Sequence, residues 1–156
     1  MVSFAHSHRL VLACFTLIFL TGCFASEETG PEKILIPVTG TILLDGEPLA
    51  NAAVNFQPTK GTTTQGAYGV TDAAGKFTAK QYSQTEGVEP GTYSVTFSKI
   101  AMPDGSPIPE GQTAADVGAV ESLPPHLTAA SETGSKYVLT VAAEPVLADY
   151  ELKSRP

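Results

Sequence analysis

Apolar and polar residues alternate along several short stretches of the chain, which is the pattern of β-strands with one face in a core and the other in water. The clearest stretch is Thr92–Ser98, in which Tyr93, Val95 and Phe97 take every second position. Small polar residues fill the positions between them: Thr92, Ser94, Thr96 and Ser98. We therefore expect the three large side chains in the core and the small polar ones in solvent.

Six further stretches repeat this alternation. The residues expected on their core faces are Val38, Gly40, Ile42 and Leu44; Val54 and Phe56; Tyr68 and Val70; Phe77 and Ala79; Tyr137, Leu139 and Val141; and Ala148, Tyr150 and Leu152. Turn residues separate the stretches: Asp45-Gly46 suits a tight hairpin, Asp72 and Gly75 suit a capped turn, and Pro58 ends a strand. The pattern predicts seven strands, no convincing helix and an all-β, two-layer sandwich.

Residues 101–135 interrupt the strand pattern. This segment has prolines at positions 103, 107, 109, 124 and 125, carries acidic residues, and contains no Lys or Arg. A connection of this length within a compact domain is usually functional or disordered. We expect this segment to be either the contact surface of a binding domain or a partly disordered acidic cover. In both cases the fold should not require its length. Thr113 and Asp116 are placed to cap a short helix between Thr113 and Val120.

The N-terminal residues have the order of an export signal. Arg9 precedes an apolar run, Leu10–Leu20, which is too short to cross a bilayer core of about 30 Å as a helix. The run leads into Leu20-Thr21-Gly22-Cys23, which resembles the lipobox of bacterial lipoproteins. The resemblance implies that residues 1–22 are removed and that Cys23 receives a lipid. Residues 23–37 are polar and interrupted by proline, so we expect a tether, followed by a folded domain at 38–153.

The net charge limits the classes of partner, and the cysteine content limits the possible disulfides. The chain has a net charge of −7, and removal of Arg9, the one fixed charge in residues 1–22, makes it −8. Binding of a phosphate backbone needs a basic patch, so nucleic acid is excluded as a partner. Cys14 leaves with the signal and Cys23 is taken up by lipid, so we expect no disulfide within one chain.

Five motifs follow one another in the first part of the expected domain. They are Val38-Thr39-Gly40-Thr41, Asp45-Gly46-Glu47-Pro48-Leu49, Ala53-Val54-Asn55-Phe56, Thr71-Asp72-Ala73-Ala74-Gly75-Lys76-Phe77 and Pro90-Gly91-Thr92-Tyr93-Ser94-Val95. Their order resembles the carboxypeptidase regulatory-like, or transthyretin-like, domain, and especially the version found in small bacterial lipoproteins. The resemblance covers Val38–Phe97 and rests beyond it on the last two strands. It implies a seven-stranded Greek-key β-sandwich that positions or binds other molecules, and it does not imply catalysis.

The catalytic sets of enzymes on related scaffolds are incomplete in this chain. The hydrolase of hydroxyisourate needs several histidines and a C-terminal Tyr-Arg-Gly-Ser, and intradiol dioxygenases need two histidines and two tyrosines. After residue 22 this chain has one histidine, His126, and it ends in Leu-Lys-Ser-Arg-Pro. Self-crosslinking adhesin domains need a lysine in the first strand, which is absent, and Asp149 in the last strand is expected to face solvent.

Other candidate sites have simpler structural explanations. Asp72 and Gly75 lack the further carboxylates of a calcium loop, so a plain turn is expected. His126 has no metal-ligating neighbour in the sequence and is the one histidine base available to a serine nucleophile. The four tyrosines Tyr68, Tyr93, Tyr137 and Tyr150 are expected to pack in the core instead of forming a sugar platform. We therefore predict no catalytic residue, no metal and no cofactor.

The sequence thus predicts an exported protein that lipid at Cys23 anchors to the membrane of the bacterial cell envelope. Phe24 follows the cysteine where an inner-membrane protein of bacteria with two membranes usually has Asp, which favours the outer membrane. The function expected is a non-catalytic binding or structural module that contacts an envelope protein or a glycan. Two alternatives remain open: an accessory subunit of an envelope transport or secretion assembly, and an enzyme of unrecognised type.

Overall fold

The computed structural model describes residues 33–129 and 136–155. The described elements are β1 (Val38–Leu44), β2 (Glu47–Pro48), β3 (Ala53–Pro58), β4 (Ala67–Val70), β5 (Lys76–Thr78), β6 (Gly91–Ser98), β7 (Ile100–Ala101), α1 (Ala114–Val117), β8 (Val120–Glu121), α2 (Pro125–Thr128), β9 (Tyr137–Val141), β10 (Val146–Leu147) and β11 (Tyr150–Leu152). This part of the chain is all-β, as predicted. The predicted signal (1–22), the lipid site Cys23 and most of the predicted tether lie outside the described residues.

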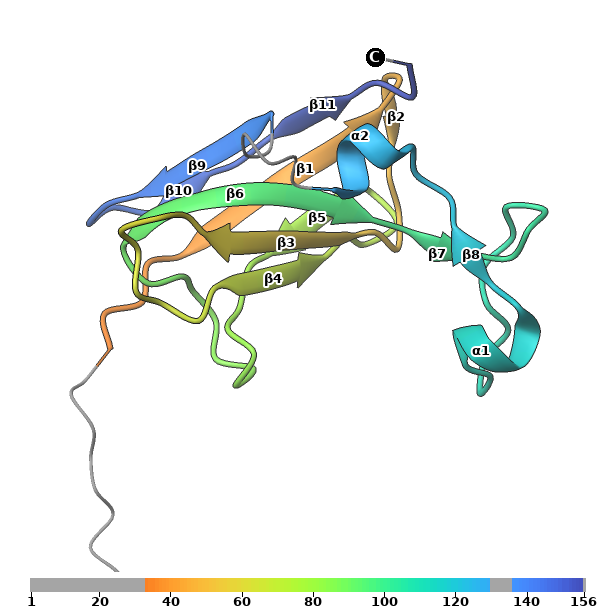
Figure 1. Cartoon of the computed structure of the whole chain (residues 1–156), viewed down its shortest axis with the longest axis horizontal. Helices are drawn as coiled ribbons and strands as arrows, with labels where there is room; N and C mark the ends of the chain where they lie inside the picture. The colour runs from red at the N-terminus through yellow and green to blue at the C-terminus, as the bar shows by residue number, and fades with distance from the viewer. Residues whose placement is uncertain (1–32, 130–135, 156) are drawn as a thin grey trace, which may run out of the picture. The chain divides into compact units, whose positions relative to one another are not determined.

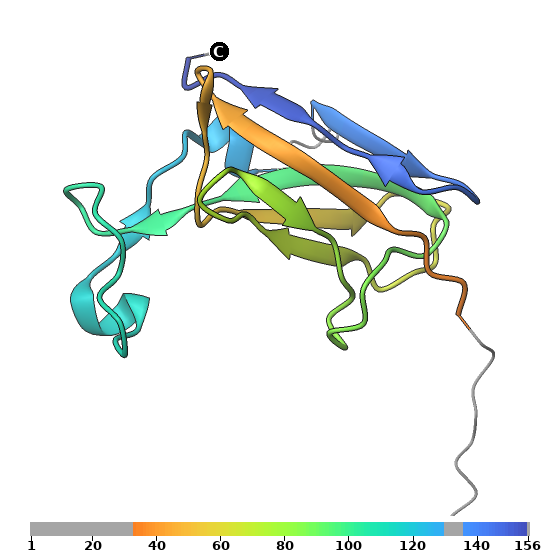
Figure 2. The same ribbon diagram turned by 180° about the vertical axis from the view of Figure 1, so that it is seen from behind.

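The strands form two larger sheets and one small one (Figures 1 and 2). In the first sheet, β1 pairs antiparallel with β2 and β5 and parallel with β10 and β11. The second has the order β4-β3-β6-β9, with every neighbouring pair antiparallel. The apolar sides of these two sheets share one core. The small sheet, β7 paired with β8, continues from the C-terminal end of β6 (Figure 1).

The central strand β6 carries the middle of the core. Tyr93, Val95 and Phe97 are fully buried, which confirms their predicted face. Ser94 and Thr96 are also buried, with 7% and 2% of their surface exposed, so the expectation that the opposite face is wet is wrong for these two residues. A central strand is flanked on both sides by neighbouring strands, and short side chains between larger neighbours are covered even on the outer face.

Strand β1 follows its predicted alternation and shows why a glycine lies in it. Val38, Gly40 and Ile42 are buried. A Cβ atom on Gly40 would lie 2.0 Å from the carbonyl oxygen of Ala148, so the approach of the β10–β11 segment leaves room only for glycine. The Asp45-Gly46 turn to β2 has φ values of 53° and 92°, the positive pair of a type I′ hairpin, as predicted.

Strand β4 has the opposite orientation to the one expected. Ala67 and Gly69 face the core, whereas Tyr68 is half-buried and Val70 is 54% exposed. A Cβ on Gly69 would come within 2.8 Å of the Phe77 ring and 3.3 Å of the Thr78 carbonyl oxygen. Close approach of β5 therefore requires glycine at the inward position, and the larger side chains of β4 lie outside.

The last strands follow the prediction. Val141, Ala148 and Leu152 are buried, and Tyr137, Leu139 and Tyr150 pack against the core from its rim. Phe97, Tyr137 and Tyr150 meet edge to face, with ring centroids 5.2 to 5.8 Å apart. Asp149 is exposed as expected, and its carboxylate accepts a hydrogen bond from the Thr41 amide at 2.7 Å.

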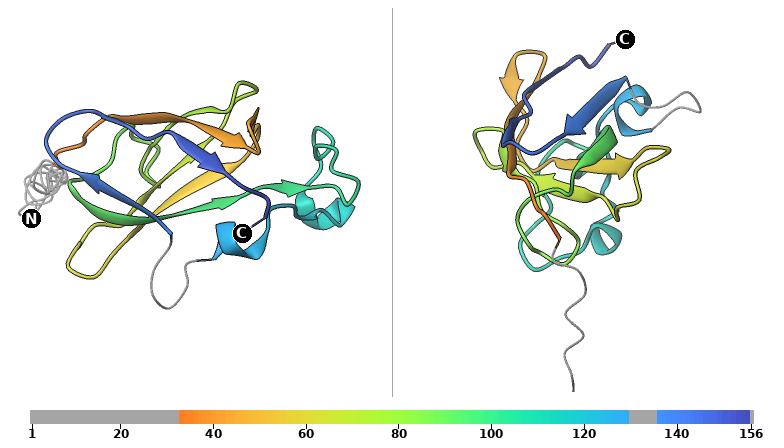
Figure 3. Two further views of the ribbon diagram at one scale, coloured as in Figure 1. Left: turned by 90° about the horizontal axis from the view of Figure 1, so that it is seen from above. Right: turned by 90° about the vertical axis from the view of Figure 1, so that its left-hand side faces the viewer.

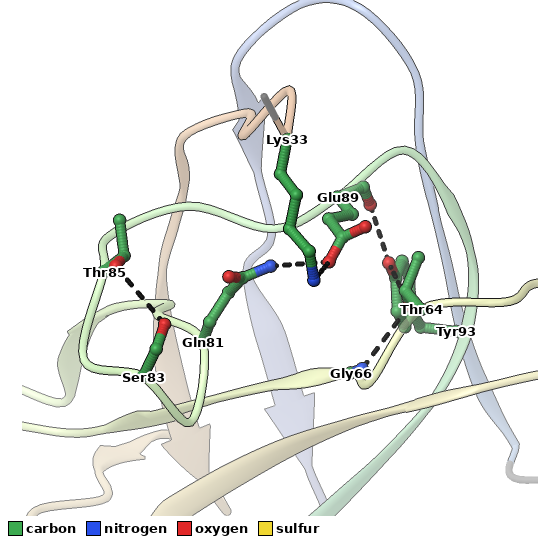
Figure 4. A network of polar contacts seen from close by, with 8 residues as sticks. All are labelled: Lys33, Thr64, Gly66, Gln81, Ser83, Thr85, Glu89 and Tyr93. Carbon is green, nitrogen blue, oxygen red and sulfur yellow. Dashed lines mark hydrogen bonds and ion pairs between the residues drawn. The ribbon is translucent and has the colours of Figure 1, made fainter. Parts of the chain in front are cut away.

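The folded part begins before Val38, inside the segment predicted to be a tether. Ile36 is buried and exchanges two backbone hydrogen bonds of 2.9 Å with Val88. The Lys33 ammonium lies 2.9 Å from the Glu89 carboxylate, which also accepts from the Gln81 amide at 2.8 Å (Figure 4). An apolar residue and an ion pair thus fix this segment against residues 79–89.

A tyrosine hydroxyl closes the turn into β6 at the same end of the domain. Tyr93 Oη donates to the carbonyl oxygen of Glu89 at 2.6 Å and lies 3.0 Å from Thr64 Oγ1 (Figure 4). Burial raises the pKa of the Tyr93 phenol, so the group stays a neutral donor at physiological pH. Such a corner, with a tyrosine bonded to backbone a few residues upstream, recurs in Greek-key sandwiches.

Residues Ile100–Glu121, here called the arm, extend from the end of β6 (Figures 1 and 3). Thr113 and Asp116 form the capping box of α1, as predicted, although the helix is only Ala114–Val117. The short helix α2, which the sequence analysis missed, follows the arm. Leu123 and Leu127 are buried in the main core with 5% and 2% exposure. The expectation that the fold does not require the length of segment 101–135 is therefore wrong for the part that contains these two leucines. No helix in the described part is long and apolar enough to span a bilayer.

Candidate functional site

The groups considered for chemistry lie apart from one another. His126 is exposed, and its Nε2 lies 3.0 Å from the carbonyl oxygen of Lys153. Asp72 accepts from the amides of Ala74 and Lys76 at 2.8 and 2.9 Å, which is the turn predicted from the sequence. Within residues 33–129 and 136–155, no cluster of three or more His, Cys, Asp or Glu side chains could hold a metal ion.

A pair of stacked tyrosines lies on the outer side of the second sheet. The Tyr68 ring, on β4, and the Tyr82 ring, at the tip of the turn 81–85, have centroids 5.5 Å apart and planes inclined by 21°. The Lys80 ammonium lies 5.7 Å from the centre of the Tyr68 ring, within range of a cation–π interaction. We call Tyr68, Lys80, Tyr82 and Gln84 the aromatic platform.

Hydrogen bonds fix the inner ring of the platform. Tyr68 Oη lies 2.7 Å from Nε2 and 3.1 Å from Oε1 of Gln84, so both polar atoms of this one amide contact the phenol. The turn that carries Tyr82 and Gln84 closes through backbone bonds of 2.8 Å from Gln81 to Thr85 and 2.9 Å from Gln84 to Gln81. Tyr68 is thus positioned by three neighbours, whereas Tyr82 remains 58% exposed. The arrangement offers a pre-oriented aromatic face to solvent.

Polar side chains continue the platform across the sheet. Asn55 lies directly opposite Tyr68, Tyr68 opposite Lys80, and Lys80 opposite Glu86. Residues directly opposite in neighbouring strands share a face of the sheet. The row therefore places an amide, an aromatic ring, an ammonium and a carboxylate side by side, a mixture of hydrogen-bond donors and acceptors around an aromatic centre.

A hollow, here called the arm pocket, lies where the arm leaves the domain. It has a volume of about 440 Å³ and is lined by Ala50, Asn51, Lys99, Ile100, Ala101, Gly105, Pro107 and Ile108. Apolar and polar atoms contribute similar shares of the lining, and Asn51 and Lys99 are its polar side chains. Its volume lies within the usual range for small-ligand sites.

Sequence reasoning missed both features for identifiable reasons. Tyr68 was assigned to the core by its alternation with Val70, and Tyr82 lies in a turn where alternation gives no information. The signal for an outward Tyr68 is Gly69, which lies between Tyr68 and Val70. A glycine within a strand often marks a position where another backbone or a ring comes close, and such a position faces inward. The arm pocket depends on contact between residues 50–51 and 99–108, which no local pattern encodes.

Comparisons with known proteins add little. No family model and no curated protein matches this chain. Among solved structures, a 9R-lipoxygenase from Cyanothece PCC8801 matches with 16% identity and a TM-score of 0.33, over 80% of this chain but 17% of that protein. The chain therefore spans less than a fifth of the lipoxygenase, and a similarity this weak assigns neither fold nor activity to it.

Proposed function

We propose that this chain is a lipoprotein of the bacterial cell envelope, held in the outer membrane by lipid on Cys23, and that its domain is a non-catalytic module that binds glycan on the aromatic platform. The domain is proposed to be a transthyretin-like, seven-stranded Greek-key sandwich with short added strands. The all-β core and the Tyr93 corner support this assignment.

The observation that carries the proposal is the exposed ring of Tyr82 stacked on a fixed Tyr68. Sugar rings present flat patches of C–H groups edged by hydroxyls, which suit an aromatic face with hydrogen-bonding side chains beside it. The Tyr82 ring supplies the face, and the Asn55 amide and the Lys80 ammonium supply donors in the adjoining row. Because Tyr68, Lys80 and the turn are already positioned, little conformational entropy is lost on binding.

The course of the chain at the tether end agrees with a ligand close to the membrane. Residues 33–37 run beside 86–89, which continue the turn that carries Tyr82. From Cys23 to Lys33 an extended chain spans at most about 35 Å, at roughly 3.5 Å per residue. A lipid on Cys23 would therefore keep the platform within reach of glycans that cover the membrane surface.

Glycan binding is tested with Tyr82→Ala and a control of nearly equal exposure, Val138→Ala. Tyr82 is 58% and Val138 60% exposed, and Val138 lies on β9 away from the platform. Polysaccharide fractions of bacterial envelopes are titrated against the full-length protein and followed by tyrosine fluorescence, since the chain has no tryptophan. Loss of the stacking surface is expected to weaken binding about tenfold in Tyr82→Ala, about 1.4 kcal/mol, with no change in Val138→Ala. Equal affinities for the two variants, or no glycan bound by the wild type, would refute the proposal.

Lipid attachment is tested separately, by labelling cells with radioactive palmitate and separating their membranes. Cys23→Ser should remove the label and leave an unprocessed precursor, because the thiol is the proposed acceptor. A wild-type protein that takes up no label and remains in the buffer fraction would contradict the anchored location without touching the glycan proposal.

The second candidate function is an accessory subunit of an envelope transport or secretion assembly. The position of the arm favours this candidate. The arm follows the C-terminal end of β6, whereas the tether segment is fixed beside Glu89, close to the N-terminal end of β6 (Figure 1). Eight strand residues separate these ends by about 26 Å. Crosslinking in the intact envelope from a photoreactive group at Glu110 would recover a defined partner complex if this candidate holds.

A further inference from the structure

We infer that the arm pocket binds the C-terminal end of a peptide chain whose last side chain is apolar. This site is separate from the aromatic platform and does not depend on the glycan proposal. The pocket lies at the end of β6 that is remote from the tether segment, and its walls come from the arm and from the turn before β3.

The pocket walls are held by hydrogen bonds and are therefore formed before any ligand arrives. Both oxygens of the Glu121 carboxylate are engaged: Oε1 accepts from the amides of Lys99 and Leu123 at 2.9 and 2.8 Å, and Oε2 accepts from Ser98 Oγ at 2.6 Å. These hydrogen bonds hold the pKa of Glu121 below its usual value, in spite of the opposing effect of desolvation. The base of the arm is thus locked onto the end of β6.

The outer wall is a closed turn. The Met102 amide donates to the carbonyl oxygen of Ser106 at 2.9 Å, and the Gly105 amide donates to that of Met102 at 2.8 Å. Asp104 accepts from both the amide and the hydroxyl of Ser106. On the opposite wall, the backbone N–H of Asn51 donates to the carbonyl oxygen of Thr71 at 3.1 Å and holds the turn, in which Asn51 has a φ of 56°. Pro107 and Ile108 thus line a pocket whose walls are held by these hydrogen bonds.

The polar groups of the pocket indicate the head group of the ligand. Within the part of the chain that the structure describes, Lys99 forms no ion pair and the Asn51 side chain forms no hydrogen bond. Three acids of the arm accept hydrogen bonds from other groups: Glu121 from its three donors, Asp104 from Ser106 and Asp116 from Thr113. An ammonium without a counter-ion beside an apolar wall favours a carboxylate joined to an apolar group.

Such a carboxylate occurs at the end of a peptide chain and in a fatty acid, and the Asn51 amide distinguishes the two. A peptide has an N–H and a C=O next to its terminal carboxylate, which an amide side chain can pair with both as acceptor and as donor. A fatty acid offers Asn51 only its carboxylate oxygens, which accept from the amide NH2 but give the amide oxygen no donor. The terminal apolar side chain then lies against Ile100 and Ile108.

The test compares three probes on the full-length protein by calorimetry: acetyl-Ala-Ala-Leu with a free carboxylate, the same peptide with a C-terminal amide, and hexanoate. We expect the free acid to bind at least tenfold more tightly than the amide, and hexanoate to bind more weakly than the acid. Lys99→Met should remove the difference between acid and amide, and Lys99→Arg should keep it. Lys60→Met, at an exposed position outside the pocket, is the matched control and should behave as the wild type.

Three results would overturn the inference. If acid and amide bind equally, or if neither binds at millimolar concentration, Lys99 does not recognise a carboxylate. If hexanoate binds as tightly as the peptide acid, the pocket belongs to a fatty acid. Unfolding midpoints of all variants are measured alongside, and Ile108→Asp provides a second variant on the opposite wall that should lose binding while keeping the fold.

Discussion

The arm and the segment that follows it should differ sharply in their importance for stability. From Pro103 to Gly118 no residue is buried, and Ala101 lies directly opposite Val120. Replacing Pro103–Gly118 with Asn-Gly and joining Met102 to Ala119 should therefore leave a two-stranded hairpin on an intact domain. Replacing Pro103–Glu132 with a Gly-Ser linker also removes Glu121, Leu123 and Leu127, and this longer replacement should unfold the protein or nearly so.

The magnitudes follow from burial. Truncating one fully buried leucine to alanine costs about 2 to 5 kcal/mol, so the loss of Leu123 and Leu127 together costs about 4 to 10 kcal/mol. That is most of a typical domain stability of about 5 to 15 kcal/mol. Shortening the arm removes exposed residues and three doublings of loop length at most, which stabilises the folded state by no more than about 2 kcal/mol.

Guanidinium titrations followed by tyrosine fluorescence and near-ultraviolet circular dichroism would measure both replacements. Leu123→Ala and Leu127→Ala serve as point controls and should each lower the midpoint, while the Asn-Gly replacement stays within about 2 kcal/mol of the wild type. Equal midpoints for the short and the long replacement would refute the assignment of Leu123 and Leu127 to the core. A short replacement that unfolds would mean that the arm supports the domain through contacts other than burial.

Two further predictions concern the core. Phe97→Ala should cost about 3 to 5 kcal/mol in the same titration, because the ring is fully buried between Tyr137 and Tyr150, whereas Val138→Ala should stay within about 0.5 kcal/mol; similar costs would place Phe97 outside the core. Among residues 33–129 and 136–155, Tyr150 Oη has no hydrogen-bond partner, and burial raises its pKa to about 12, so the folded state keeps a proton that the unfolded state loses above about pH 10. Stability should therefore fall between about pH 10 and pH 12, and Tyr150→Phe, which should be as stable as the wild type at pH 7 or more so, should flatten that fall; an unchanged pH profile in Tyr150→Phe would contradict the assignment.

Alternation was a reliable guide wherever one face of a strand meets the core and the strand is not crowded. It identified the inward residues of β1, β6, β9 and β11, and the turn chemistry of Asp45-Gly46 and of Asp72 was also right. It failed for β2, β7, β8 and β10, since a two-residue strand has no period. It did not indicate the partner of Ser98, whose hydroxyl donates to Glu121 at 2.6 Å on the exposed side of the strand, because that partner lies 23 positions along the chain.

The error at β4 shows why the candidate site escaped the sequence. Tyr68 and Val70 were placed inward because large apolar residues usually face a core, but this rule compares side chains and not the space available to them. Close approach of the Phe77 ring leaves no room for a Cβ at position 69, so Gly69 must face inward and its neighbours must face out. The same packing puts Tyr68 on the surface, where Tyr82, Lys80 and Gln84 hold it. The aromatic platform is thus a consequence of the corner between β4 and β5, and Gly69→Ala should disturb the platform and the core together.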